Sequence, residues 1–124
     1  MSDAIRTFET GATRSADNKK FDYEGFLSPL VIEEFGRFMH KHRIQADGTL
    51  RASDNWQKGI TPESYMKSAW RHFMSWWKMH RGHEAFDEKG NPVDFKEEIC
   101  ALIFNAQGYL HELIKKEQAA RGAK

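Results

Sequence analysis

This chain contains a single cysteine, Cys100, so no disulfide can form within it. A lone thiol is typical of proteins from a reducing compartment. Because Cys100 lies within an apolar run, we expect a small buried thiol rather than a reactive nucleophile. No apolar run approaches the roughly 20 residues of a membrane-spanning helix, and the first residues lack the charged and apolar regions of a secretory signal. The sequence therefore predicts a cytoplasmic protein with no membrane partner.

An excess of charge of either sign is also missing. Nineteen lysines and arginines stand against 18 aspartates and glutamates, for a formal net charge of +1. Such a balance gives no direct signal for nucleic-acid binding. Four tryptophans and nine phenylalanines argue against disorder. The length predicts a single domain over residues 1–124, with a polar N-terminal arm at 1–22 and a frayed tail at 118–124.

Prolines are few, and two of the three follow a capping residue, in Ser28-Pro29 and Thr61-Pro62. A capping hydroxyl followed by a first-turn proline is a typical helix start. Apolar residues then recur at three- and four-residue steps. The fold class is therefore predicted to be all-α, a small helical bundle of three main helices. These cover residues 28–43, 61–81 and about 94–117.

The first two helices are joined by a long connecting loop over residues 44–60. Its Ala46-Asp47-Gly48 segment is a turn signal, which predicts a minor hairpin near 43–51. A connector of this length in a small domain is unusual unless it has a function.

The second predicted helix is apolar over much of its circumference. One apolar stripe, expected in the core, contains Met66, Trp70, Phe73 and Trp77. A second stripe beside it contains Tyr65, Ala69, His72 and Trp76. Such a helix is either central or shared with a partner subunit, which favours a homodimer. In the third helix the predicted core stripe contains Ile99, Ile103, Ala106, Leu110 and Leu113.

The aromatic helix also carries Arg71 and His72 at its middle. Burying either side chain is unfavourable unless it is hydrogen-bonded, ion-paired or bound to a ligand. His72 is thus a candidate metal ligand or proton-transfer group, with a satisfied structural histidine about equally weighted. Arg71 suits an anionic group such as a phosphate, although a solvated helix face would also explain it.

Two acidic residues, Glu97 and Glu98, begin the third helix. Carboxylate oxygens are the ligands that Mg2+ and Mn2+ prefer. Acids are also favoured at any helix start, so this position alone is weak evidence for a metal. Asn105 lies deeper on the face of Glu98, about 10 Å along the axis. That separation suits opposite ends of a small ligand better than a single metal ion.

Ahead of the aromatic helix, Asn55 and Trp56 are followed by Lys58. An asparagine in a turn is commonplace. A tryptophan beside a lysine can instead offer a stacking surface and a cation, as nucleotide sites do.

Taken in order, these elements resemble the N-terminal domain family of dATP/dGTP diphosphohydrolases, which are mostly phage-encoded. The resemblance covers the chain from about Phe8 to Leu113. The matching segments are Gly11-Ala12-Thr13-Arg14, Lys20-Phe21-Asp22, Ser28-Pro29, Asn55-Trp56 with Lys58-Gly59, Ser68 to His72, and Asn105. Two departures are visible: Glu97-Glu98 stands where the family usually has an acid followed by histidine, and the loop before it is longer.

The resemblance implies hydrolysis of a purine deoxynucleotide, dATP or dGTP, to the monophosphate and pyrophosphate with Mg2+ or Mn2+. It implies His72 and Glu98 as catalytic residues and Glu97, Glu98 and His72 as metal ligands. It places Asn55, Trp56, Lys58, Arg71 and Asn105 at the substrate. The Glu-x-x-Glu and Glu-x-x-Asp pairs of related all-α pyrophosphohydrolases are not reproduced, since Ala101 stands where Asp would be. Two alternatives therefore stay open: a non-catalytic nucleotide-binding or regulatory protein, and a protein-interaction module.

Overall fold

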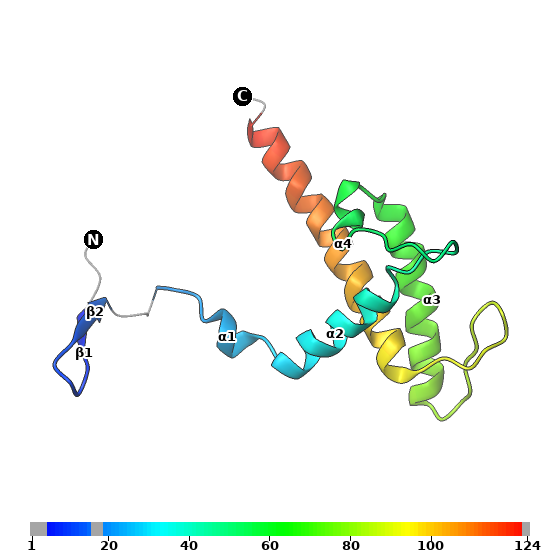
Figure 1. The fold of residues 1–124 in the computed structure, drawn as a ribbon, viewed down its shortest axis with the longest axis horizontal. Coiled ribbons are helices and arrows are strands. Elements are labelled where there is room, and N and C mark those ends of the chain that lie inside the picture. The colour runs from blue at the N-terminus through cyan, green and yellow to red at the C-terminus, as the bar shows by residue number, and fades with distance from the viewer. Residues whose placement is uncertain (1–4, 16–18, 123–124) are drawn as a thin grey trace. The chain divides into compact units, whose positions relative to one another are not determined.

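The computed structural model describes residues 5–15 and 19–122 and is mostly helical, which confirms the all-α prediction (Figure 1). The elements in chain order are β1 (Ile5–Thr7), β2 (Thr13–Ser15), α1 (Tyr23–Phe26), α2 (Pro29–Lys41), the 3-10 helix η1 (Asn55–Lys58), α3 (Pro62–His80) and α4 (Phe95–Gly122). The chain divides into two compact units, residues 1–32 and 33–124. No helix among the described residues is both long and apolar enough to cross a membrane.

The N-terminal unit contains a small hairpin that the sequence analysis missed. β1 and β2 pair antiparallel, with Thr7 opposite Thr13. The turn closes through the backbone N–H of Phe8, which donates to the Ala12 carbonyl at 2.8 Å. Gly11 adopts the positive φ of 89° that this turn requires. The three residues of β1 are exposed, and neither strand has a sequence that alternates apolar and polar residues, so the segment resembled an arm without regular structure.

Local caps fix the starts of the three long helices, and the caps at Ser28 and Thr61 confirm the predicted starts of α2 and α3. The Ser28 hydroxyl accepts from the backbone N–H of Val31 at 3.3 Å, and Thr61 caps α3 in the same way. Asp94 accepts from two backbone N–H groups of the first turn of α4. The end of α4 differs from the prediction, because the helix continues to Gly122 rather than stopping near Glu117.

α3 and α4 pack along each other in opposite directions and form the core of the second unit (Figure 1). The most deeply buried large side chain is Tyr65 of α3, whose ring lies directly on Gly108 of α4. Ala101 and Cys100 are buried as well, so the prediction of a buried thiol is confirmed. Burial raises the pKa of the Cys100 thiol, which keeps it protonated and unreactive.

The predicted core stripes are largely wrong. Trp70, Phe73 and Trp77 are exposed, as are Leu110 and Leu113. α3 carries two adjacent apolar stripes, and only the one containing Tyr65 faces α4. The buried positions of α4 are instead small or polar: Glu98, Cys100, Ala101, Asn105 and Gly108.

The connector between α2 and α3 contains the expected turn as a single antiparallel bridge between Ile44 and Leu50. Gln45 donates its backbone N–H to the Thr49 carbonyl at 2.8 Å, and Gly48 supplies the positive φ of 85°. The remainder of the connector returns along α4 to the short helix η1.

Candidate functional site

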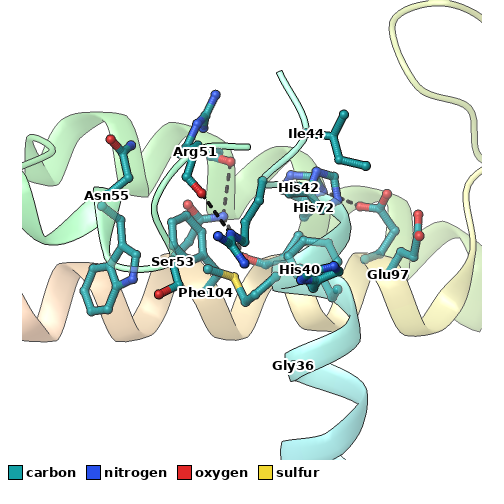
Figure 2. A pocket seen from close by; sticks show the side chains of 18 of the residues that line it. Gly36, His40, His42, Ile44, Arg51, Ser53, Asn55, His72, Glu97 and Phe104 are labelled. Carbon is teal, nitrogen blue, oxygen red and sulfur yellow. Dashed lines mark hydrogen bonds and ion pairs between the residues drawn. The ribbon is translucent and has the colours of Figure 1, made fainter. Parts of the chain in front are cut away.

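A cavity of about 860 Å³ opens in the second unit. Its walls come from the C-terminal half of α2, the connector, α3, the loop before α4 and the first half of α4 (Figure 2). This volume lies in the range of small-molecule sites. Six of the sequence-predicted site residues line it: Asn55, Trp56, His72, Glu97, Glu98 and Asn105.

A polar contact at the cavity wall joins α3 to α4. His72 Nδ1 lies 2.5 Å from Glu98 Oε2, and the Glu98 side chain is only 9% exposed. A carboxylate this buried requires a partner, because an unpaired buried charge is strongly destabilising. The pair places an imidazole and a carboxylate at the cavity wall, a combination used for proton transfer.

Glu97, the next residue, forms an ion pair with Lys41 of α2. Its carboxylate is therefore occupied, as is the Glu98 oxygen that faces His72. Within residues 5–15 and 19–122, no group of three or more His, Cys, Asp or Glu side chains is close enough together to hold a metal ion. The carboxylates have the right donor chemistry for Mg2+ or Mn2+, but Glu97 would have to exchange Lys41 for the metal.

Asn105 is held in a fixed orientation. Its Nδ2 donates to the Ser68 hydroxyl at 3.1 Å and to the Ala101 carbonyl at 2.9 Å. The Ala101 carbonyl can only accept a hydrogen bond. A flip of the Asn105 amide would place its oxygen against that carbonyl and lose the hydrogen bond. Both donors are thus used within the protein, and the side-chain oxygen remains as the acceptor that Asn105 can offer to a ligand.

Trp56 anchors η1 to α4 as well as lining the cavity. Its ring packs edge-on against Phe104, with centroids 6.2 Å apart, and against His111 at 4.9 Å. The Lys115 ammonium adds a long hydrogen bond of 3.5 Å to the carbonyl of Gln57. These contacts fix one end of the connector, so Asn55 and Trp56 form a defined wall rather than a loose loop.

Two predicted substrate residues do not line the cavity. Arg71 is exposed on α3, and Lys58 is exposed at the end of η1. Neighbouring residues on a helix point about 100° apart, so Arg71 cannot share the direction of His72.

The cavity has a basic side that the sequence analysis did not identify. Arg43, Arg51, His40 and His42 all line it. Arg43 donates from Nε to the Arg51 carbonyl at 2.8 Å, and the backbone of Arg51 donates back to the Arg43 carbonyl at 2.8 Å. This exchange fixes the Arg43 guanidinium at the wall with its terminal N–H groups available to an anion. Basic residues are favoured at the end of any helix, so the basic end of α2 does not by itself indicate a site.

His42 and His72 lie at the same end of the cavity as Glu97, whereas Asn55 lies toward the other end (Figure 2). Partial burial lowers the pKa of His42, the Glu97 charge opposes this, and the nearby Lys41 charge adds to it. His42 is therefore mainly neutral at pH 7 and becomes cationic only at lower pH.

The cavity thus has a basic side that contains Arg43 and Arg51, and the His72–Glu98 pair lies at its wall. Residues 10–120 match the family described as dATP/dGTP diphosphohydrolase, N-terminal, and the chain belongs to this family. The match confirms the resemblance seen in the sequence. No curated protein and no solved structure matched the chain. At the level of the domain, the family description indicates a hydrolase of dATP and dGTP.

The lowered pKa of His42 predicts a pH dependence of anion binding. We expect a triphosphate bound beside His42 to favour the imidazolium form, so that binding takes up a proton and affinity rises as pH falls from 8 toward 6. Each proton taken up contributes at most about tenfold per pH unit. His42→Asn is expected to flatten this slope for dATP or dGTP in calorimetric titrations. His80→Asn, at an exposed histidine, is the matched control and is expected to keep the wild-type slope. A wild-type slope in His42→Asn would contradict the prediction.

Proposed function

We propose that the chain hydrolyses purine deoxynucleoside triphosphates to the monophosphate and pyrophosphate in this cavity. The observation that carries the proposal is the His72–Glu98 pair, which lines the same cavity as the Arg43 guanidinium in a member of this family. Hydrolysis of a triphosphate needs both functions: a group that directs a water at phosphorus and cations that neutralise the phosphate oxygens.

The phosphate chain is assigned to the basic side of the cavity. Arg43 is the principal contact, since its Nε bond to Arg51 orients the guanidinium before any ligand binds. His42 adds a charge when protonated. An arginine fixed in this way matches phosphate oxygens with two parallel hydrogen bonds.

The proton-transfer group is assigned to His72, with Glu98 as its partner. Glu98 holds the imidazole through Nδ1, which fixes the orientation of the ring at the cavity wall. Glu97 and Glu98 would hold Mg2+ or Mn2+, which supplies neutralisation of the phosphate charge. For Glu97 this requires release from Lys41.

The base is assigned to the region of Asn105, Asn55 and Trp56. Both amide protons of Asn105 are already donated within the protein. A ligand that binds its side-chain oxygen must therefore supply a hydrogen-bond donor. The 6-amino group of adenine and the N1–H and 2-amino groups of guanine are such donors. This is consistent with a site that accepts either purine.

A second function is favoured by one observation, namely that the described residues contain no ready group of three metal ligands. A chain that binds the nucleotide in the same cavity without hydrolysing it would act as a sensor or regulatory protein. In that case the His72–Glu98 pair would be structural.

One experiment separates hydrolysis from the regulatory function. The chain is incubated with a panel of deoxynucleoside triphosphates and Mg2+ or Mn2+, and both pyrophosphate release and thermal unfolding are measured. Hydrolysis predicts metal-dependent pyrophosphate release from dATP or dGTP. The regulatory function predicts stabilisation without release, by about 2.7 kcal/mol when the nucleotide is at 100 times its Kd. A panel that gives neither release nor a shift in Tm would overturn both.

A further inference from the structure

Ser68 of α3 lines the cavity next to Asn105 of α4. Its hydroxyl oxygen accepts the 3.1 Å hydrogen bond from Asn105 Nδ2. Ser68 is partly buried and precedes His72 by one helical turn, so the two side chains lie on the same face of α3. Ser68 therefore belongs to the wall where the base of the nucleotide is proposed to bind.

The hydroxyl proton of Ser68 is available to a ligand. A hydroxyl can accept a hydrogen bond and donate its own proton at the same time. Within residues 5–15 and 19–122, no backbone or side-chain group accepts the Ser68 proton, including the Ser64 carbonyl to which a serine in a helix can donate. A partly buried donor without an acceptor in the protein is well placed for a ligand, because polar groups away from water are normally hydrogen-bonded.

Asn105 supplies the complementary group. It is 4% exposed, and both of its amide protons are donated, to Ser68 and to the Ala101 carbonyl. Its oxygen is still open to the cavity, since the fully enclosed and unpartnered side-chain atoms in the described part of the chain are Tyr65 Oη and Glu112 Oε1. The wall thus offers a fixed acceptor and, one hydrogen bond away, a donor.

We propose that Ser68 and Asn105 together recognise the purine base, with the Asn105 oxygen as the acceptor and the Ser68 hydroxyl as the donor. This inference rests on the proposed binding of a nucleotide in the cavity. Adenine has a donor, the 6-amino group, with the acceptors N1 and N7 on either side of it. Guanine has the N1–H donor beside the O6 acceptor. Each purine therefore presents a donor next to an acceptor, which is the pattern that the two side chains require.

The pair selects against a base that has no donor on this edge. Such a base leaves the Asn105 oxygen without a partner in a nearly closed site, which is unfavourable. 2′-Deoxynebularine 5′-triphosphate, which is dATP without the 6-amino group, is a nucleotide of this kind. We expect its Kd to exceed that of dATP by about 10-fold or more.

The test is calorimetric titration of the full chain, as wild type and as Ser68→Ala, with four probes: dATP, dGTP, 2′-deoxynebularine 5′-triphosphate and inorganic triphosphate. Ca2+ replaces Mg2+, because its looser coordination geometry disfavours turnover. Inorganic triphosphate has no base, so its Kd reports only on the contacts to the phosphate chain.

Ser68→Ala is expected to raise the Kd of dATP and dGTP by about 3–10-fold, which is the contribution of one hydrogen bond, and to change that of inorganic triphosphate less than about twofold. Ser75→Ala is the matched control. Ser75 is also a partly buried serine of α3, but it does not line the cavity. This variant is expected to bind all four probes as wild type does.

A Kd for 2′-deoxynebularine 5′-triphosphate equal to that of dATP would overturn the inference. Ser68→Ala would also overturn it by weakening dATP and inorganic triphosphate equally, which indicates a structural role, or by weakening neither. If no nucleotide binds to wild type, the inference fails together with the proposed function. The expected pattern of Kd values without any pyrophosphate release in Mg2+ would support the inference and reject only hydrolysis.

Discussion

Glu98→Gln is expected to lower the rate of pyrophosphate release from dATP or dGTP by about 100-fold or more. The substitution keeps the size of the side chain and a hydrogen-bond acceptor for His72, but it removes the charge that orients and stabilises the imidazole. Loss of a positioned proton-transfer system lowers rates by about 10²–10⁴-fold. The measurement is the steady-state rate at saturating nucleotide and metal, with Kd measured separately by calorimetry.

The comparison variant is Glu117→Gln, which neutralises a carboxylate on the exposed end of α4. It is expected to retain the wild-type rate. If Glu98→Gln keeps more than half of the wild-type rate, the buried carboxylate has only a structural role and the assignment of catalysis to this pair is wrong.

Gly108→Ala is expected to be among the most destabilising single substitutions in the α3–α4 core. A Cβ at this position would lie 2.2 Å from Cζ and 2.3 Å from Cε1 of Tyr65. These are ring atoms of the most deeply buried aromatic side chain, so relief requires the helices to move apart. Overpacking of this kind costs about 1–3 kcal/mol of unfolding free energy. Chemical denaturation of wild type and variant measures the difference.

Gly36→Ala is the control for helix propensity, because a Cβ at Gly36 in α2 has no other atom within 4 Å. Replacing glycine by alanine in a helix raises stability by up to about 1 kcal/mol, so the two substitutions are expected to have opposite signs. Equal effects at both positions would show that Tyr65 does not press on Gly108 as described.

The positions of the helices were predictable because their start signals are local. The hydroxyl of Thr61 and the proline after it act within one turn, and the same holds for Ser28. The hairpin of β1 and β2 was not predictable, since strands of three residues are too short to show an apolar pattern. The end of α4 was also missed, because its last turns are exposed and have no stop signal before Gly122.

Burial was the least predictable property. An apolar a/d seam shows that a helix packs against something, but not whether the partner lies in the same chain. α3 has two such seams, and the sequence cannot tell that the stripe of Tyr65 is occupied while that of Trp70 is exposed. On α4 the buried face carries Glu98 and Asn105, which an apolar pattern would place outside.

The residues that line the cavity were predicted in part, and the differences have physical explanations. His72 and Glu98 are 26 residues apart, and their contact depends on the antiparallel packing of two helices. Arg71 was included because a guanidinium suits a phosphate and because it lies in the Ser68 to His72 segment of the resemblance, yet one step along a helix turns it away from the cavity. Arg43 was overlooked because a basic residue near a helix end already has an explanation in the helix dipole.

We propose that a purine deoxynucleotide binds in the cavity bounded by α2, the connector, α3 and α4. The most direct test is a two-dimensional NMR titration of the ¹⁵N-labelled chain with dATP or dGTP in the presence of Mg2+. We expect saturable chemical-shift changes at the Asn105 side-chain amide and the Trp56 indole N–H. The indole signals of Trp70 and Trp77 should not move. Shifts confined to Trp70 and Trp77, or none at saturating nucleotide, would contradict it.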